Sequence, residues 1–269
     1  MKLKIIDTKN SEKGEIQLPK QFEEESRPDI VKRAVHSIFS KIRQKYGAKP
    51  DAGMRASADL SRRRRKYKGS YGHGISRVPR KIMSRRGTRF NWVGAVAPGT
   101  VGGRRAHPPK ADKIWEQKIN RKENRKAIRV AISATINNET VKERGHSPPE
   151  KYPFILDDSF ENIKKTKELI NILKAIGLEK ELERASIKRV RAGKGKLRGR
   201  RYKKAIGPLI VVSKECELKN AVSNIPGLES IDVKKLNAKI LAPGAIPGRL
   251  TLFTKSSIEK MEKEKLFNN

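Results

Sequence analysis

The sequence predicts an α/β fold: a single globular domain with a mostly parallel sheet flanked by helices, interrupted by a long extended basic loop. Two observations predict it. Short apolar runs of strand length alternate along the chain with segments in which apolar residues recur at three- and four-residue steps, as on one face of a helix. Between residues 46 and 111 this patterning stops, and Gly, Pro, Lys and Arg dominate. We therefore expect a globular body formed by residues 1–45 and 112–269, and an extended loop formed by residues 46–111.

The N-terminal part predicts a hairpin followed by a helix. Apolar residues alternate with polar ones within residues 3–18, which is typical of short strands. From Ile30 to Ile42 apolar residues return at helical spacing, and the helix is expected to end near Gly47. Ser26 and Asp29, three residues apart, resemble an acidic capping box at its start.

The patterning of the body returns after the loop. Residues 114–132 predict a helix and Pro153–Leu156 a strand, after which Asp158 is expected to cap a helix that Gly177 ends. The apolar run Leu209–Val212 predicts a strand buried on both faces. The remaining elements are expected as a helix over Leu218–Val222, strands near Ile231–Val233 and over Arg249–Phe253, and a helix from Ser256.

The charge of the chain limits the classes of function. Its 269 residues include 64 Lys and Arg against 29 Asp and Glu, a formal net charge of +35. A net charge this large makes the folded chain repel itself, and this repulsion is tolerated when a polyanion neutralises it. Nucleic acid is therefore the expected partner. A membrane is not expected, because no apolar run approaches the roughly 20 residues that span a bilayer. The first ten residues, MKLKIIDTKN, do not resemble a signal peptide, which predicts a cytoplasmic location.

The loop is the most basic part of the chain. It holds 10 Gly, 5 Pro and 17 Lys or Arg but two acids, and from Leu60 to Ala111 it has 15 Lys or Arg and no acid. Without periodic apolar residues it cannot offset its ordering entropy, so we expect it to be disordered or merely extended in the free protein. A loop of this length inside a domain is usually functional.

A second basic segment, residues 188–204, contains ten Lys or Arg, three glycines and no acid, and is expected to be a surface loop that binds RNA backbone. Interleaved glycines let backbone approach phosphates, and arginine forms bidentate phosphate contacts. This combination favours irregular folded RNA over duplex DNA, although Arg62–Lys66 alone is equally typical of a solvated run or a localisation signal. The residues expected to bind RNA are Arg62, Arg63, Arg64, Arg65, Lys66, Lys68, Arg85, Arg86, Arg89, Arg104, Arg105, Lys188, Arg189, Arg191, Lys194, Lys196, Arg198, Arg200 and Arg201.

Four aromatic residues accompany the arginines of the loop. Tyr67, Tyr71, Phe90 and Trp92 offer faces on which unpaired bases can stack. The same four side chains are also suited to a small apolar cluster within the loop, and the sequence leaves both interpretations open.

The sequence contains no supported catalytic constellation. Gly193–Gly199 lacks the order of a phosphate-binding Walker loop, and the histidines and the single Cys216 do not have zinc-ligand spacing. Cys216 is interpreted as a small packing residue, because the adjacent acids oppose thiolate formation. Asp157 and Asp158 are better explained as helix capping than as a nuclease metal site. We expect no enzyme activity and no cofactor.

Five strings occur in order along the chain: GSYGHG from Gly69 continuing to Arg77-Val-Pro-Arg80, GGRRAHPPK from Gly102, Arg144-Gly-His146, RAGKGKLRGRRY from Arg191, and LAPGAIPGRL from Leu241. Together they resemble the large-subunit ribosomal protein “L four” family in its archaeal and eukaryotic form. The resemblance covers essentially the whole chain, and its compact length favours the archaeal form.

The resemblance implies a body on the outer surface of the large subunit and a loop that reaches through ribosomal RNA (rRNA) to the peptide exit tunnel, with binding early in assembly. The implied partners are large-subunit rRNA, ribosomal protein “L twenty-two” at the tunnel constriction and, transiently, the nascent peptide; no homo-oligomer is expected. An architectural DNA-binding protein and an RNA-processing factor are the alternative functions. The implied tunnel-proximal loop tip contains Gly72, His73, Gly74, Arg77 and Arg80.

Overall fold

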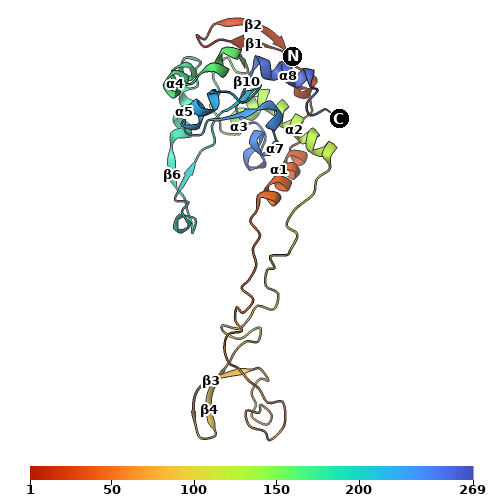
Figure 1. Cartoon of the computed structure of the whole chain (residues 1–269), viewed down its shortest axis with the longest axis vertical. Coiled ribbons are helices and arrows are strands. Elements are labelled where there is room, and N and C mark those ends of the chain that lie inside the picture. The colour runs from red at the N-terminus through yellow and green to blue at the C-terminus, as the bar shows by residue number, and fades with distance from the viewer. Residues whose placement is uncertain (269) are drawn as a thin grey trace. The chain divides into compact units, whose positions relative to one another are not determined.

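The computed structural model describes residues 1–268 and divides the chain into two compact units. The first, which we term the body, contains Met1–Ile42 and Glu116–Asn269. The second, the basic unit, contains Arg43–Trp115. Each is described separately below (Figure 1).

The body is built on a six-stranded sheet in the order β2-β1-β5-β10-β8-β9. The N-terminal hairpin of β1 and β2 is antiparallel, whereas every other pair of neighbouring strands is parallel. This confirms the predicted α/β class and the mostly parallel sheet. The strands are β1 (Lys2–Ile6), β2 (Glu12–Gln17), β5 (Ile155–Leu156), β8 (Leu209–Val212), β9 (Glu229–Asp232) and β10 (Thr251–Thr254).

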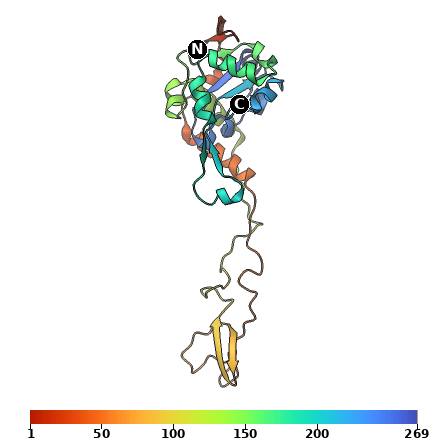
Figure 2. The ribbon, with the colours of Figure 1, turned by 90° about the vertical axis from the view of Figure 1, so that its left-hand side faces the viewer.

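Helices cover both faces of this sheet (Figure 2). Successive residues of β8 show why: Leu209 and Val211 join one hydrophobic cluster, and Ile210 and Val212 join the other. The period-2 alternation of a strand therefore supplies two cores from one apolar run, as predicted for Leu209–Val212. The first cluster packs α1 (Pro28–Ile42), α2 (Arg121–Ile136), α7 (Ala238–Leu241) and α8 (Lys255–Lys263), and the second packs α3 (Asn138–Glu143), α4 (Thr166–Ala175), α5 (Glu179–Ser186) and α6 (Leu218–Ser223).

The helix predicted from residue 114 begins only at Arg121. The backbone of Gln117 instead binds the last turns of α1: its carbonyl accepts from Ser37 Oγ at 2.6 Å, and its N–H donates to Ser40 Oγ at 2.9 Å. These bonds replace helical ones and hold the preceding residues extended. α1 itself ends at Ile42 rather than near Gly47.

The capping expected at two helix starts is also different. The Asp29 carboxylate accepts two hydrogen bonds from the Arg27 guanidinium, at 2.8 and 3.0 Å. Asp158 lies in a 3₁₀ turn, Asp158–Asn162, and α4 starts later, at Thr166. The Asp158 carboxylate accepts a hydrogen bond of 2.8 Å from the N–H of Ser256, in the first turn of α8. Asp158 therefore caps a helix that is distant in sequence.

Residues 188–204, predicted as a surface loop, form a hairpin. β6 (Lys188–Val190) pairs antiparallel with β7 (Tyr202–Lys204), and a short 3₁₀ turn, Lys196–Arg198, lies at the end of the hairpin. Within the body the hairpin projects from the sheet (Figure 1). The Arg191 guanidinium donates to the Arg200 carbonyl at 3.0 Å and helps to close the turn.

The basic unit contains one regular element, the antiparallel hairpin of β3 (Arg80–Arg86) and β4 (Arg89–Gly94) (Figure 2). Its presence corrects the expectation of a loop without regular structure. The signal was in the sequence: Phe90, Trp92 and Gly94 alternate with exposed residues, and Gly87, at φ +57°, turns the chain.

Candidate nucleic-acid interface

The basic unit has a defined backbone but almost no core. Within Arg43–Trp115 the buried residues are Ser70 and Ala95, and neither hydrophobic cluster includes any residue of this unit. The unit carries 20 Lys and Arg against three acids. Among these described residues one ion pair forms, Lys68 with Asp59 at 3.8 Å. Neither apolar burial nor internal ion pairing therefore offsets the charge of this unit.

Most of the residues predicted to bind RNA are exposed. Lys68 and Arg191 are half-buried: Lys68 pairs with Asp59, and Arg191 donates to backbone carbonyls of its own hairpin. Arg85 is exposed but donates to the Tyr67 hydroxyl at 3.0 Å. The remaining side chains make no hydrogen bond or ion pair with another described residue; they are Arg62, Arg63, Arg64, Arg65, Lys66, Arg86, Arg89, Arg104, Arg105, Lys188, Arg189, Lys194, Lys196, Arg198, Arg200 and Arg201. Their contact with RNA stays a prediction.

Three of the four loop aromatics lie together. The ring of Phe90 is 5.2 Å from that of Tyr67, edge to face, and 5.5 Å from that of Trp92. Tyr71 lies apart from them and accepts a hydrogen bond from Arg77 at 3.4 Å. The structure thus shows the apolar cluster for three rings, while Tyr67 is still 54% exposed. Base stacking by these residues stays a prediction.

The residues of the predicted loop tip surround a turn with two glycines. Gly72 and Gly74 have φ of +79° and +64°, which favours glycine at both positions. His73 and Arg77 are exposed, whereas Arg80 is half-buried with its guanidinium 5.3 Å from the Trp92 ring. The tip therefore presents the exposed imidazole of His73 and the exposed guanidinium of Arg77, which donates to the Tyr71 hydroxyl, while Arg80 packs on the Trp92 ring.

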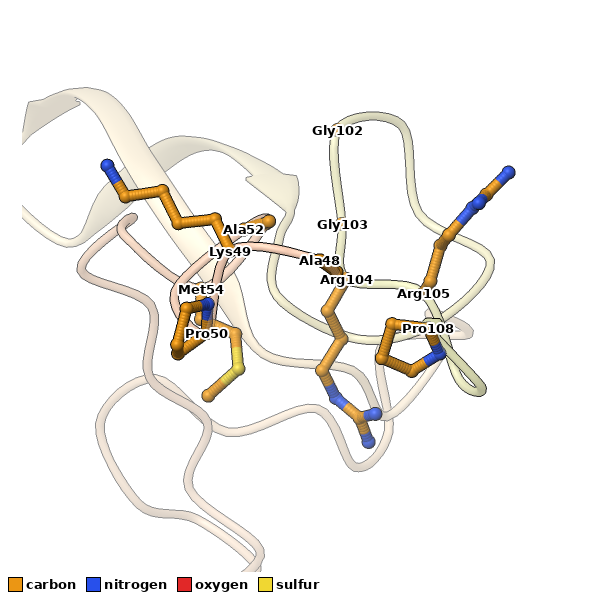
Figure 3. Close-up of a pocket in the computed structure, with 11 residues that line it drawn as sticks. Ala48, Lys49, Pro50, Ala52, Met54, Gly102, Gly103, Arg104, Arg105 and Pro108 are labelled. Carbon is orange, nitrogen blue, oxygen red and sulfur yellow. The ribbon is translucent and has the colours of Figure 1, made fainter. Parts of the chain in front are cut away.

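A cavity of 270 Å³ lies where the GGRR string packs against the start of the loop. A Cβ on Gly53 would lie 2.5 Å from the backbone N of Arg104, so glycine is required for this close approach. Figure 3 shows the Arg104 side chain between Met54 and Pro108, while Arg105 points away. Arg104 thus has an apolar support beneath a free guanidinium, which suits an ordered phosphate contact.

The second basic segment places like charges opposite one another. In the hairpin Lys188 faces Lys204, and Arg189 faces Lys203. Like charges directly across an antiparallel pair are destabilising. Leu197, at the end of the hairpin, is 89% exposed. An anionic partner beside the hairpin would offset this repulsion.

Sequence reasoning missed an aromatic pair at the ends of the basic unit. Tyr46 stacks on Trp115 with ring centroids 4.9 Å apart and planes 28° apart. The Arg43 guanidinium lies 4.5 Å from the Trp115 ring, and Lys113 Nζ lies 4.9 Å from it. Trp115 was assigned to a helix from its spacing. A better signal was the occurrence of an aromatic residue two or three positions after a cation at both ends of the acid-poor stretch.

The acids and cysteine singled out by the sequence have structural partners. Asp157 pairs with Lys13 at 3.1 Å and accepts from Ser159 at 2.9 Å. Burial raises the pKa of the Cys216 thiol, which packs against the second hydrophobic cluster, as predicted. Residues 1–268 contain no group of three or more His, Cys, Asp or Glu side chains placed to hold a metal ion. In the same range no helix is both long and apolar enough to cross a bilayer.

Two of the strings that suggested the family support the body from inside. His146 Nδ1 lies 2.7 Å from Glu181, a fully buried carboxylate that also accepts from Arg184 at 2.7 and 2.8 Å. Burial opposes ionisation of Glu181, but the bonds from Arg184, His146 and Ser147 outweigh it and lower its pKa to about 2. Arg249, 1% exposed, donates to the carbonyl of Gly207 at 3.0 Å.

The sequence of this chain was compared with known families and proteins. The family model described as “Ribosomal protein L4/L1 family” matches residues 16–264. The chain belongs to this family. Among its relatives in the L4/L1 family, “Large ribosomal subunit protein uL4” of Nanoarchaeum equitans is 48% identical over 268 residues, covering 99% of this chain and all of the relative.

Two further L4/L1 family members of the same printed name come from other archaea. The protein of Archaeoglobus fulgidus is 44% identical over 260 residues, covering 96% of this chain and 97% of the relative. That of Methanocaldococcus jannaschii is 44% identical over 266 residues, covering 98% of this chain and 99% of the relative. The predicted family and its archaeal form are confirmed, and the family model covers all of the basic unit and most of the body.

Proposed function

We propose that this chain is a structural constituent of the large ribosomal subunit, in the cytoplasm, and that its basic unit and second basic segment bind large-subunit rRNA during assembly. The observation that carries the proposal is the basic unit itself. Seventy-three residues adopt a defined backbone with two buried residues and an excess of 17 positive charges. A segment without a core gains its ordering free energy from a partner.

The chemistry of the exposed side chains favours RNA as that partner. The free guanidiniums are distributed over turns and hairpins instead of one helix face, which suits the irregular backbone of folded RNA better than a major groove. The names of the relatives place those proteins in the large ribosomal subunit, which agrees with this inference.

The loop tip is proposed to line the polypeptide exit tunnel. Gly72, His73, Gly74 and Arg77 are all exposed in the basic unit, in keeping with the role that the family resemblance implies. The neighbours at this point are proposed to be ribosomal protein “L twenty-two” and, transiently, the nascent peptide.

Sedimentation and crosslinking test the proposal. Tagged protein expressed in an archaeal host is sedimented from lysate in high salt, and the nucleic acid crosslinked to it by ultraviolet light is sequenced. Co-sedimentation with the large subunit and crosslinks from the basic unit to large rRNA are expected. Sedimentation as free protein, or crosslinks mainly to DNA, would favour the architectural DNA-binding alternative.

The tunnel assignment has a separate test. A variant with His73→Cys and Cys216→Ser carries one thiol, at the loop tip. On translating ribosomes a short thiol-reactive crosslinker is expected to join it to the nascent chain. A matched variant with the thiol at Ser186, in α5 of the body, is expected to give no such product. Equal crosslinking from both positions would overturn the assignment.

A further inference from the structure

The two ends of the basic unit are joined by backbone contact. The N–H of Ala48 donates to the Pro109 carbonyl at 2.9 Å, and a Cβ on Gly47 would lie 2.9 Å from the backbone N of Ala111. Residues 43–50 and 105–115 therefore lie side by side within the unit (Figures 1 and 2). Glycine at position 47 permits this approach.

Beside this contact lies a cavity of 800 Å³. Its size falls within the range of about 300 to 1,000 Å³ that is usual for small-ligand pockets. The stacked pair Tyr46 and Trp115 lines it together with residues Arg105–Lys110. Asp112 and Lys113 complete the lining.

The charge around this cavity is positive. Arg105, Lys110 and Lys113 line it together with one acid, Asp112, and none of these four side chains forms an ion pair with another described residue. Arg43, outside the lining, stands over both aromatic rings, 5.4 Å from Tyr46 and 4.5 Å from Trp115. Aromatic faces combined with unpaired cations match a ligand that is flat at one end and anionic at the other.

The aromatic pair is not explained by packing of a hydrophobic core. Neither ring belongs to the two hydrophobic clusters of the body, and Tyr46 is 47% exposed. The indole Nε1–H of Trp115 is buried and has no acceptor among the described residues. Buried donors normally have an acceptor, so packing within the chain does not account for this indole.

We propose that this cavity holds one unpaired nucleobase of RNA, stacked against the Tyr46–Trp115 pair, with the adjoining phosphate bound by Arg105, Lys110 and Lys113. The inference rests on the proposed RNA-binding function and adds a specific site to it, outside the residues predicted from sequence to stack on bases. Stacking makes the site selective for a base over a bare phosphate, because aromatic rings bind the π-face that every base has.

Tryptophan fluorescence of the full chain tests the site. Trp92 and Trp115 are the two tryptophans, so a Trp92→Phe variant reports on Trp115 alone. The probes are oligoadenylate and, as a polyanion without bases, inorganic polyphosphate of equal charge. Oligoadenylate is expected to quench Trp115 emission, and polyphosphate is not. Equal quenching by both, or by neither, overturns the proposal.

Adding Tyr46→Ala to this variant is expected to weaken the oligoadenylate titration about 5- to 150-fold, the range seen when one stacking aromatic is removed. The matched control is Phe39→Ala: Phe39 is 42% exposed with Lys239 5.6 Å from its ring, but it does not line the cavity. Its titration is expected to be unchanged. Filter binding of the same variants to large-subunit rRNA separates the base-site hypothesis from the proposed RNA-binding function. Retained rRNA binding without Trp115 quenching rejects the base site alone. Absence of rRNA binding in every variant and in the unmodified chain rejects the proposed function.

Discussion

At the scale of single residues, Glu181 is the side chain on which the body most depends. It is a carboxylate with no exposed surface, and it is ionised because Arg184, His146 and the N–H of Ser147 all bind it. Removing one partner from a buried charged network is more damaging than the net free energy of the network suggests, because the remaining charges stay buried without compensation.

We expect Glu181→Gln to lower the free energy of unfolding at neutral pH by about 3 kcal/mol, measured by chemical denaturation. The pKa of Glu181 is about 2 in the folded state against 4.5 ordinarily, so its contribution is complete above pH 4.5 and is lost as pH falls towards 2. The difference between wild type and variant should therefore shrink over that range. Glu179→Gln, on the same helix, removes an exposed pair with Lys174 and should lower the free energy of unfolding far less than Glu181→Gln does. A difference that does not change with pH would contradict this account.

Gly103 is the residue on which the position of Arg104 depends. A Cβ there would lie 2.2 Å from the Ala97 carbonyl and 2.3 Å from Thr100 Oγ1, so the turn must open. Overpacking costs about 1 to 3 kcal/mol. Because the basic unit has no core of its own, we expect this cost to appear as weaker RNA binding. Gly103→Ala should therefore raise the Kd for rRNA about 5- to 150-fold. Filter binding measures it. Gly94→Ala is the control, because the nearest neighbours of its Cβ would be methyl groups, of Thr100 at 3.0 Å and of Val78 at 3.5 Å; equal losses would reject the steric explanation.

At the scale of elements, the hairpin of β6 and β7 carries like charges opposite one another, which lowers its own stability and would favour the proposed RNA binding. Lys203→Glu would place an acid opposite Arg189, which should stabilise the free hairpin by about 0.2 to 1 kcal/mol. The same change should weaken RNA binding and reduce the slope of log K against log salt by about 1 or more. Amide hydrogen exchange and salt-dependent RNA titrations measure the two effects.

Lys203→Gln distinguishes the two effects of that substitution. It removes the positive charge without adding a negative one, so it should also reduce the salt slope while stabilising the hairpin less. Unchanged slopes in both variants would mean that this hairpin does not contact phosphate.

The elements also show which parts of the structure could be predicted from sequence. Strands and helices with strong apolar periodicity, such as β8 and α6, were predicted at the correct residues, because local pattern and burial agree there. The failures had tertiary causes. Gln117 is held by serines of α1, and Asp158 caps α8, nearly a hundred residues away. No local pattern contains those partners.

The candidate interface was predictable as basic segments of the chain, but not as an arrangement of side chains. Charge and the absence of acids identified the basic unit and the second basic segment, because electrostatics depends mainly on composition. The Tyr46–Trp115 pair was missed because it joins the two ends of the unit through a backbone contact between Ala48 and Pro109. That contact depends on a close approach at Gly47, which composition does not reveal.

At the scale of the whole molecule, the hydrophobic cores lie in one unit, whereas the proposed RNA contacts lie mainly in the other. Both hydrophobic clusters lie in the body, and most of the unpaired cations identified above lie in the basic unit. Replacing residues 51–104 by a short Gly-Ser linker should therefore shift the Tm of the body by less than about 4 °C, the equivalent of roughly 1 kcal/mol. Calorimetry measures this shift.

The same replacement should reduce RNA binding strongly. If about ten phosphates are neutralised by the intact chain, its affinity falls with roughly the ninth power of salt concentration, and the shortened chain should show a much shallower dependence. A large fall in Tm would mean that the basic unit stabilises the body. An unchanged salt slope would mean that RNA binding resides elsewhere.

The strand order of the body has a consequence for synthesis. β10, near the C-terminus, pairs with both β5 and β8, so a strand in the interior of the sheet is the last to be translated. The complete basic unit is translated before any of these three strands exists. Because the sheet of the body cannot be completed before β10 is available, the cationic segment is translated before the body can close. Synthesis of β10, and not of the first strands, is therefore the step that completes the sheet.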